Sequence, residues 1–262
     1  MAGGPDGGAA NVILITLDTL RADRLSSYGS DRVATPHIDR LASEGVLFTN
    51  AASTVPFTLP AHSSMMTGTY PPRHGVRENV GYVLDESLPT LAERLAAGGW
   101  TTAAFVSAFV LDSRWGIARG FETFFDEFEV AEGERANLGS VQRDGRETID
   151  AAVRWLDDRP EGPFFLWLHR FDAHDPYEPP EPFRTQYAGR PYEGEVAYVD
   201  WLVGDFRDAL AERDLLDTSL LLLTGDHGEG LGQHREGFHG LSLIHISEPT
   251  RLDLASRMPS SA

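Results

Sequence analysis

Two kinds of segment alternate along this chain. Four short runs are almost wholly apolar and partly β-branched, which is typical of strands buried on both faces of a parallel sheet. They cover residues 12–17, 101–106, 164–168 and 219–223. Apolar residues recur at helical spacing in four further segments, which cover residues 36–44, 87–97, 146–157 and 192–213. The alternation predicts an α/β fold with a mostly parallel sheet sandwiched by helices.

Polar residues that can bind a metal ion follow these predicted strands. Asp18 comes directly after the first run, His174 lies in the loop after the third, and Asp226-His227 follow the fourth. The carboxyl ends of parallel strands meet at one edge of the sheet, where ligands bind. An adjacent Asp and His are a sound ligand pair for a divalent ion, whereas a lone Asp is as typical of a turn. We therefore expect Asp18 and the Asp-His pair to share one metal site.

A further candidate site residue is Thr58, which lies two positions before Pro60. Proline suits the first turn of a helix, so we expect a short helix over residues 61–66 that stops at Gly68. Thr58 would then lie just before a helix N-terminus, where free N–H groups and the helix dipole favour an anion. A lone T-x-P is equally consistent with a turn that opens an ordinary helix.

The longer string over residues 58–75 resembles the nucleophile segment of the sulfatases, which belong to the alkaline phosphatase superfamily. Their pattern is C-x-P-x-R followed by T-G-x-x-P, so Thr58 takes the nucleophile position and His62 replaces the Arg. The T-x-P-x-H form is similar to the nucleotide pyrophosphatase/phosphodiesterase branch, whose nucleophile is Thr. The D-x-x-R-A-D string that begins at Asp18 resembles phosphonate monoester hydrolases.

This resemblance implies an alkaline phosphatase-like fold and a set of site residues. The implied metal ligands are Asp18, Thr58, Asp226 and His227. The implied catalytic residues are Thr58 as nucleophile, His62 and His174 at the transferred group, and His239 as proton donor. The implied cofactor is a divalent metal ion: the Asp-His pair favours Zn or Mn, and Ca is possible for the family.

Other histidines and acids near the predicted site are more ambiguous. His234 and His239 lie in a glycine-rich loop, where the family also has histidines. Asp172 could bind a second metal ion together with His239, although a turn role is equally consistent with its position. We interpret His169 as a core histidine, and His37 as a surface residue.

The chain departs from the sulfatase pattern in ways that bear on its substrate. Thr19 stands where the usual second Asp would be, and residues 106–109 lack the Lys and His that grip sulfate. No cysteine is present that could become formylglycine, and Thr58 has no second hydroxyl with which to expel sulfate. These features predict a metal-dependent hydrolase of sulfate esters or, by mechanism, of phosphate or phosphonate esters. The alternatives are a phospho-headgroup transferase of the same superfamily and an inactive, binding-only form.

Composition limits the partners of the 262-residue chain. Its formal charge is −18 and every Lys/Arg position is Arg, a balance that argues against a nucleic-acid partner. We expect a small anionic ester as the substrate, which local cations must capture against this charge. No run of 18 apolar residues is present, so the sequence as given predicts neither a transmembrane segment nor a signal peptide. It leaves localisation and oligomeric state open.

The two ends of the chain differ from its middle. Residues 1–10 read as a flexible, glycine-rich leader, and residues 11–240 as a sulfatase-like N-terminal catalytic domain. Residues 241–262 resemble the translation of a sequencing adapter, because two blocks of adapter codons recur in one frame and in order. We expect this tail to be non-native and to lie outside the fold. The resemblance also implies that the fold is incomplete at the C-terminus, since family members continue further.

Overall fold

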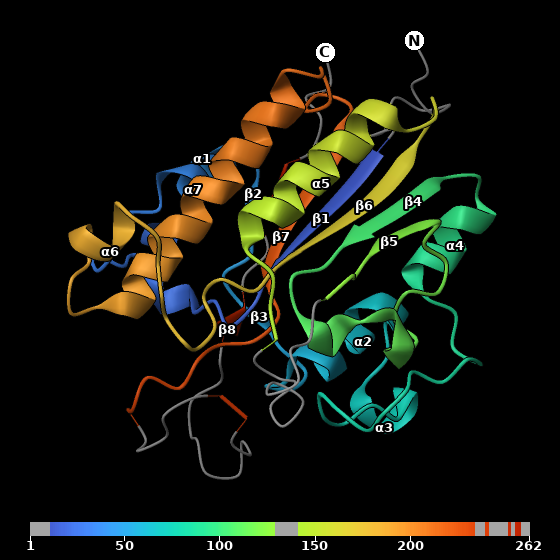
Figure 1. The fold of residues 1–262 in the computed structure, drawn as a ribbon, viewed down its shortest axis with the longest axis horizontal. Helices are drawn as coiled ribbons and strands as arrows, with labels where there is room; N and C mark the ends of the chain where they lie inside the picture. The colour runs from blue at the N-terminus through green and yellow to red at the C-terminus, as the bar shows by residue number, and fades with distance from the viewer. Residues whose placement is uncertain (1–10, 129–140, 234–238, 241–250, 253–254, 258–262) are drawn as a thin grey trace.

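The computed structural model describes residues 11–128, 141–233, 239–240, 251–252 and 255–257. Within these ranges, the main sheet has seven strands in the order β2-β9-β7-β1-β6-β4-β5 (Figure 1). Its parallel part consists of β1 (Asn11–Leu17), β4 (Thr101–Phe105), β5 (Thr123–Phe125), β6 (Phe164–Arg170) and β7 (Ser219–Gly225). The predicted, mostly parallel sheet is thereby confirmed.

Helices cover both faces of the sheet. One face carries α1 (Pro36–Glu44), α5 (Gly145–Asp158) and α7 (Pro191–Ala211), and Figure 1 shows α5 and α7 lying across the strands. The other face carries α2 (Thr58–Thr67), α3 (Pro71–His74) and α4 (Leu91–Ala97). Successive β1 side chains enter opposite cores: Ile13 packs with the first set of helices, and Leu14 packs with the second. The sandwich is therefore a three-layer α/β/α domain.

Shorter elements complete the described chain. They are the 3₁₀ helices Ala22–Arg24, Ser26–Tyr28, Phe109–Leu111 and Ser113–Trp115, α6 (Phe183–Gln186), and the strands β2 (Val46–Leu47), β3 (Ala51–Ala52), β8 (Arg251–Leu252) and β9 (Ala255–Arg257). None of the described helices combines the length and apolar character that a membrane-spanning helix needs.

Two predicted elements have different limits in the structure. The helix expected over residues 87–97 begins only at Leu91, because Thr90 and Glu93 form a capping box that fixes its first turn. The strand expected over residues 164–168 continues to Arg170, because β1 on one side supplies partners as far as Leu17. This extension places His169 inside the sheet.

The start of α1 is held by a residue that the sequence did not indicate. Thr35 occupies the predicted N-cap position, but its hydroxyl bonds Ser26 instead of capping the helix. The carboxylate of Asp200 on α7 accepts the N–H groups of Ile38 at 2.8 Å and His37 at 3.3 Å. His37, predicted as a surface residue, is half-buried, and its ring lies against Gly204.

The segment 241–262 contributes backbone to the fold. β9 pairs antiparallel with both β7 and β2, and β8 pairs antiparallel with β3. These two strands thus pair with the fold from which the sequence interpretation excluded them. The origin of the segment as translated adapter stays a prediction.

Candidate active site

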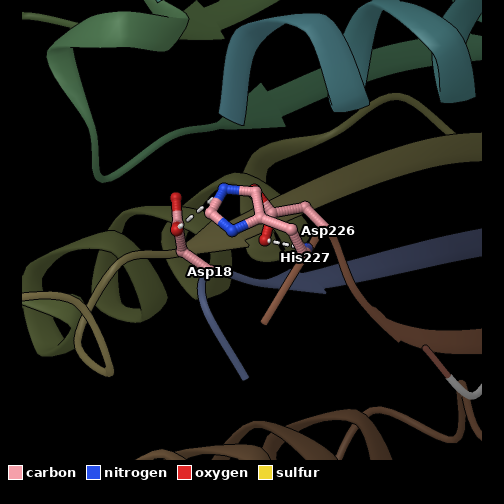
Figure 2. Close-up of side chains that lie close together, drawn as sticks. All are labelled: Asp18, Asp226 and His227. Carbon is pink, nitrogen blue, oxygen red and sulfur yellow. Dashed lines mark hydrogen bonds and ion pairs between the residues drawn. The ribbon is translucent and has the colours of Figure 1, made fainter. Parts of the chain in front are cut away.

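Three predicted metal ligands meet at the carboxyl edge of the sheet. Asp18 follows β1, and Asp226 and His227 follow β7, whose last residue pairs with Leu17. One ligand atom from each of the three lies within 4.8 Å of the others (Figure 2). All three side chains are at most 1% exposed. The parallel register thus brings together residues that lie more than 200 positions apart in the chain.

The polar atoms of this cluster fit a cation. Both carboxylate oxygens of Asp18 and Oδ2 of Asp226 are buried without a hydrogen-bond partner among the described residues. The Nδ1–H of His227 donates to the Gly228 carbonyl at 3.1 Å, which leaves the lone pair on Nε2. That nitrogen lies 3.8 Å from Asp18 Oδ1 and 3.4 Å from Asp226 Oδ2. Unpartnered acceptors that converge in this way are costly unless a positive ion lies between them.

The electrostatics of the cluster point the same way. Burial and the charge of Asp18 raise the pKa of Asp226 well above its ordinary value. Burial would also raise the pKa of Asp18, but the nearby His169 ring, at 3.4 Å, and the charge of His227 outweigh burial and lower that pKa. Burial lowers the pKa of His227 to about 4, so its imidazole is neutral at neutral pH. Two carboxylates compete for one negative charge here, and a divalent ion would stabilise both as anions.

Thr19 supports the cluster through its backbone. Its N–H donates to Asp226 Oδ1 at 3.2 Å, and the N–H of His227 donates to the same oxygen at 2.7 Å. This geometry requires a left-handed backbone at Thr19, with φ of 52°, an unusual conformation for a β-branched residue. Its hydroxyl donates to the Ala173 carbonyl at 2.8 Å. Thr19 therefore orients a ligand, where the sequence indicated only a missing carboxylate.

The predicted nucleophile lies beside the metal cluster. Thr58 is the first residue of α2, is fully buried, and has its Oγ1 at 3.4 Å from His227 Nε2. The helix is longer than the predicted 61–66 segment but ends at Gly68, as expected. Its N-terminus offers fewer free N–H groups than expected, because the side chain of Asn79 accepts the N–H of Leu59 and Pro60 has none.

The resemblance implied that His62 contacts the transferred group, whereas in the structure both of its ring nitrogens have partners inside the protein. Its side chain is fully buried. Nδ1 lies 2.8 Å from the Thr58 carbonyl oxygen, and Nε2 lies 3.0 Å from Thr16 Oγ1. Burial, followed by the charge of His169, lowers the pKa of His62 to about 3. A neutral imidazole with both nitrogens engaged is placed to hold Thr58 rather than to bind a transferred group.

His174 and His239 do lie together at the site. Their ring centroids are 4.8 Å apart, and the ring of His239 is 4.6 Å from that of His227. The carboxylate of Glu229 accepts the backbone N–H of His239 at 2.6 Å and lies 3.2 Å from its Nδ1. Burial would lower the pKa of His239, but the bond to Glu229 and its charge outweigh burial and raise it. His239 is therefore biased toward its protonated form.

Two further residues correct the sequence interpretation. His169 is buried as predicted, but its Nε2 lies 3.4 Å from Asp18 Oδ2, so it belongs to the site and not only to the core. Asp172 is ion-paired with Arg170 at 2.8 Å and accepts the N–H of Gly145 at 3.1 Å. Those contacts use both of its oxygens, so a role as second metal ligand is not supported. His234 lies outside the described residues.

The sequence indicated the surroundings of Glu229 and His169 but not their roles in the site. Glu229 lies three residues after Asp226 in a glycine-rich string, which marks a loop but not a partner for His239. His169 continues an apolar run, and periodicity alone makes it a core residue. Their roles come from contacts between distant segments.

Comparison with known proteins shows the family of the chain. The family model of the sulfatases matches residues 10–259. The chain belongs to the sulfatase family. Its curated relatives include N-acetylgalactosamine-6-O-sulfatase of Bacteroides thetaiotaomicron, at 25% identity over 83% of this chain and 58% of the relative. Arylsulfatase A of Homo sapiens matches at 25% identity over 96% of this chain and 58% of the relative.

A solved structure shows the same fold. Phosphonate monoester hydrolase of Agrobacterium radiobacter superposes with a TM-score of 0.81 at 22% identity, over 95% of this chain and 68% of that one. The sheet and its helices are therefore alkaline phosphatase-like, as the sequence predicted. The chain spans about 58% of the length of the two curated sulfatases.

Proposed function

We propose that this chain carries the catalytic centre of a metal-dependent ester hydrolase in which Thr58 is the nucleophile. The observation that supports it most is the convergence of the unpartnered carboxylate oxygens of Asp18 and Asp226 with the ring of His227, whose Nε2 lies 3.4 Å from the Thr58 hydroxyl. The curated relatives are sulfatases by name, and the structural relative is a phosphonate monoester hydrolase. Sulfate, phosphate and phosphonate esters are therefore the candidate substrates.

The metal site would hold a divalent cation through Asp18, Asp226 and His227, with Thr58 Oγ1 as a further ligand. Such a cation acts as a Lewis acid, which lowers the pKa of a bound hydroxyl and offsets charge on ester oxygens. The imidazole of His227 favours Zn or Mn, and Ca remains the alternative that the family suggests. The chain's own residues would supply the nucleophile, the orientation and the proton.

The reaction would then proceed in two displacements. Thr58 Oγ loses its proton to solvent and attacks the phosphorus or sulfur atom, a new ester bond to Thr58 forms, and the bond to the leaving group breaks. His239, which Glu229 biases toward its protonated form, gives its proton to the leaving oxygen. Water then attacks the same atom in line and releases Thr58. His174, stacked on Phe171 at 4.1 Å and next to His239, would orient the equatorial oxygens.

The side chain of Thr58 bears on the choice among these esters. A hydrated formylglycine has a second hydroxyl that can expel sulfate, whereas threonine has one hydroxyl and depends on water. A phosphorylated threonine can be hydrolysed by the same in-line route that formed it. We therefore expect phosphodiesters or phosphonate monoesters to be cleaved faster than sulfate esters.

The test compares Thr58→Ala with the unaltered protein, purified from the complete coding sequence. The measured rates are those on bis-p-nitrophenyl phosphate, p-nitrophenyl phenylphosphonate and p-nitrophenyl sulfate, each with added Zn, Mn or Ca. Thr58→Ala should lower every rate at least 1,000-fold, since the covalent route is lost. Thr67→Ala is the matched control, because Thr67 lies in the same helix with its hydroxyl on the Ser63 carbonyl. Full activity of Thr58→Ala would exclude Thr58 as the nucleophile, and a clear sulfate preference would overturn the substrate order.

A further inference from the structure

A chain of buried hydrogen bonds leads from the core to the backbone of Thr58. Trp167 on β6, Thr16 on β1 and His62 on α2 are all fully buried. Trp167 Nε1 lies 3.0 Å from Thr16 Oγ1, which lies 3.0 Å from His62 Nε2. His62 Nδ1 then lies 2.8 Å from the Thr58 carbonyl oxygen. The chain therefore links the middle of the sheet to the residue that carries the nucleophilic hydroxyl.

Only one arrangement of protons satisfies every member of this chain in the neutral state. The indole N–H of Trp167 can only donate, and the Thr58 carbonyl can only accept. His62 Nδ1 must therefore carry a proton and donate it to Thr58. In a neutral imidazole Nε2 is then an acceptor, so the hydroxyl of Thr16 donates to it while accepting from Trp167. Each hydroxyl and ring atom in the series has a defined role.

The same imidazole is wedged among aromatic rings that fix its plane. Its centroid lies 5.4 Å from that of Trp167 and 5.0 Å from that of His169. Its Nδ1 also lies 3.7 Å from Asp226 Oδ2. The same nitrogen of His62 thus lies close both to the first turn of α2 and to Asp226, a proposed metal ligand. A ring held in this way fixes the distance between Thr58 and the cluster around His227.

We propose that His62, oriented by Thr16 and Trp167, is a positioning residue that holds Thr58 at attack distance through the hydrogen bond from its Nδ1–H to the Thr58 carbonyl. This inference rests on the proposed function, because it assigns a role in the step that Thr58 performs. It differs from the role that the resemblance implied, in which the residue at this position binds the transferred group. A positioning residue alters the rate of the chemical step and leaves substrate binding largely intact.

Thr16→Val tests the proposal, because it keeps the shape of the side chain and removes only the hydroxyl. We expect kcat on the best p-nitrophenyl ester to fall at least tenfold, with KM and metal content changed less than twofold. Thr16→Ser restores the hydroxyl and should recover most of kcat. Thr102→Val is the matched control, since that buried hydroxyl on β4 donates to the Gly120 carbonyl and should leave kcat unchanged.

A second measurement does not depend on activity. The ¹⁵N shifts of the imidazole, assigned with His62→Gln, distinguish a protonated nitrogen from an unprotonated one. The proposal requires Nδ1 to be protonated in the unaltered protein, and requires Thr16→Val to move the Nε2 resonance. A protonated Nε2 with a bare Nδ1, or a Thr16→Val variant with unchanged kcat, would overturn it. Absence of activity toward all three ester classes would count against the proposed function, while the tautomer would still be measured.

Discussion

Replacement of Asp226 by Asn should have opposite effects on stability with and without bound metal. Asn keeps Oδ1, which accepts the N–H groups of Thr19 and His227, and it removes the charge at Oδ2. In the metal-free protein that charge lies close to Asp18, with the ligand atoms within 4.8 Å. At an effective dielectric constant of 20, two unit charges at that distance repel by about 3 kcal/mol. Losing this repulsion should stabilise the metal-free fold at high pH.

The metal-bound protein should respond in the other direction. A ligand present at 100 times its dissociation constant stabilises the folded state by about 2.7 kcal/mol. Asp226→Asn removes one of the two anionic side chains among the four proposed ligands, so this stabilisation should be largely lost. We therefore expect the free energy of unfolding at pH 8 to rise by about 1–3 kcal/mol without metal, and to fall by a similar amount in saturating Zn or Mn.

Urea unfolding followed by tryptophan fluorescence measures both effects. One series follows dialysis against a chelator, and the other contains added metal, with bound metal measured by elemental analysis. Asp200→Asn is the matched control. Asp200 is also a buried carboxylate, but it lies on α7 and accepts N–H groups from the first turn of α1. This substitution should destabilise the protein by about 1–2 kcal/mol under both conditions. An Asp226→Asn effect of the same sign and size in both series would refute a shared cation between the two carboxylates.

Two further predictions concern the fold. Burial and the charge of Asp172 raise the pKa of Glu195 from 4.5 to about 8, so the folded state keeps a proton that the unfolded chain releases. The free energy of unfolding should therefore fall as pH rises from about 4.5 to 8, by up to about 1.4 kcal/mol per unit, and Glu195→Gln should flatten this slope in urea titrations. Gly120→Ala should lower the free energy of unfolding by more than about 3 kcal/mol, because the added Cβ would lie 2.1 Å from Glu93 N at φ of 87°. A shift in its thermal midpoint of under 2 °C would contradict that contact.

The fold and the location of the site were predictable for a common physical reason. Runs buried on both faces of a parallel sheet are apolar throughout, as in β6, where all seven residues are buried. Their carboxyl ends then share one edge, so Asp18 and the Asp226-His227 pair could be brought together without knowledge of the strand order. The helix that carries Thr58 was recognisable from Pro60 and Gly68 because both act on the local backbone.

The remainder depends on contacts between distant segments, which leave no periodic signal. Asp200 caps α1 from 162 residues away, and no local pattern connects the two. Glu229 and His239 are close in sequence, but only the folded structure places one carboxylate oxygen of Glu229 close to both the backbone N–H and the ring Nδ1 of His239. Asp172 follows a strand, as a metal ligand would, yet it forms an ion pair with Arg170 two residues earlier. Sequence position alone cannot separate a ligand from an ion-paired neighbour.

The departures from the sulfatase pattern all remove charged side chains from the site. Thr19 removes a carboxylate from the site, His62 replaces an arginine with a neutral imidazole, and residues 106–109 lack the usual lysine. One negative charge and two positive charges are therefore lost together. Two carboxylates with a divalent cation are neutral, so among the site residues described above the proposed cation and His239 would be the positive partners of an anionic ester. Because few fixed cations neutralise the ester, the rate should depend strongly on the identity of the metal ion, which the side-by-side comparison of Zn, Mn and Ca measures directly.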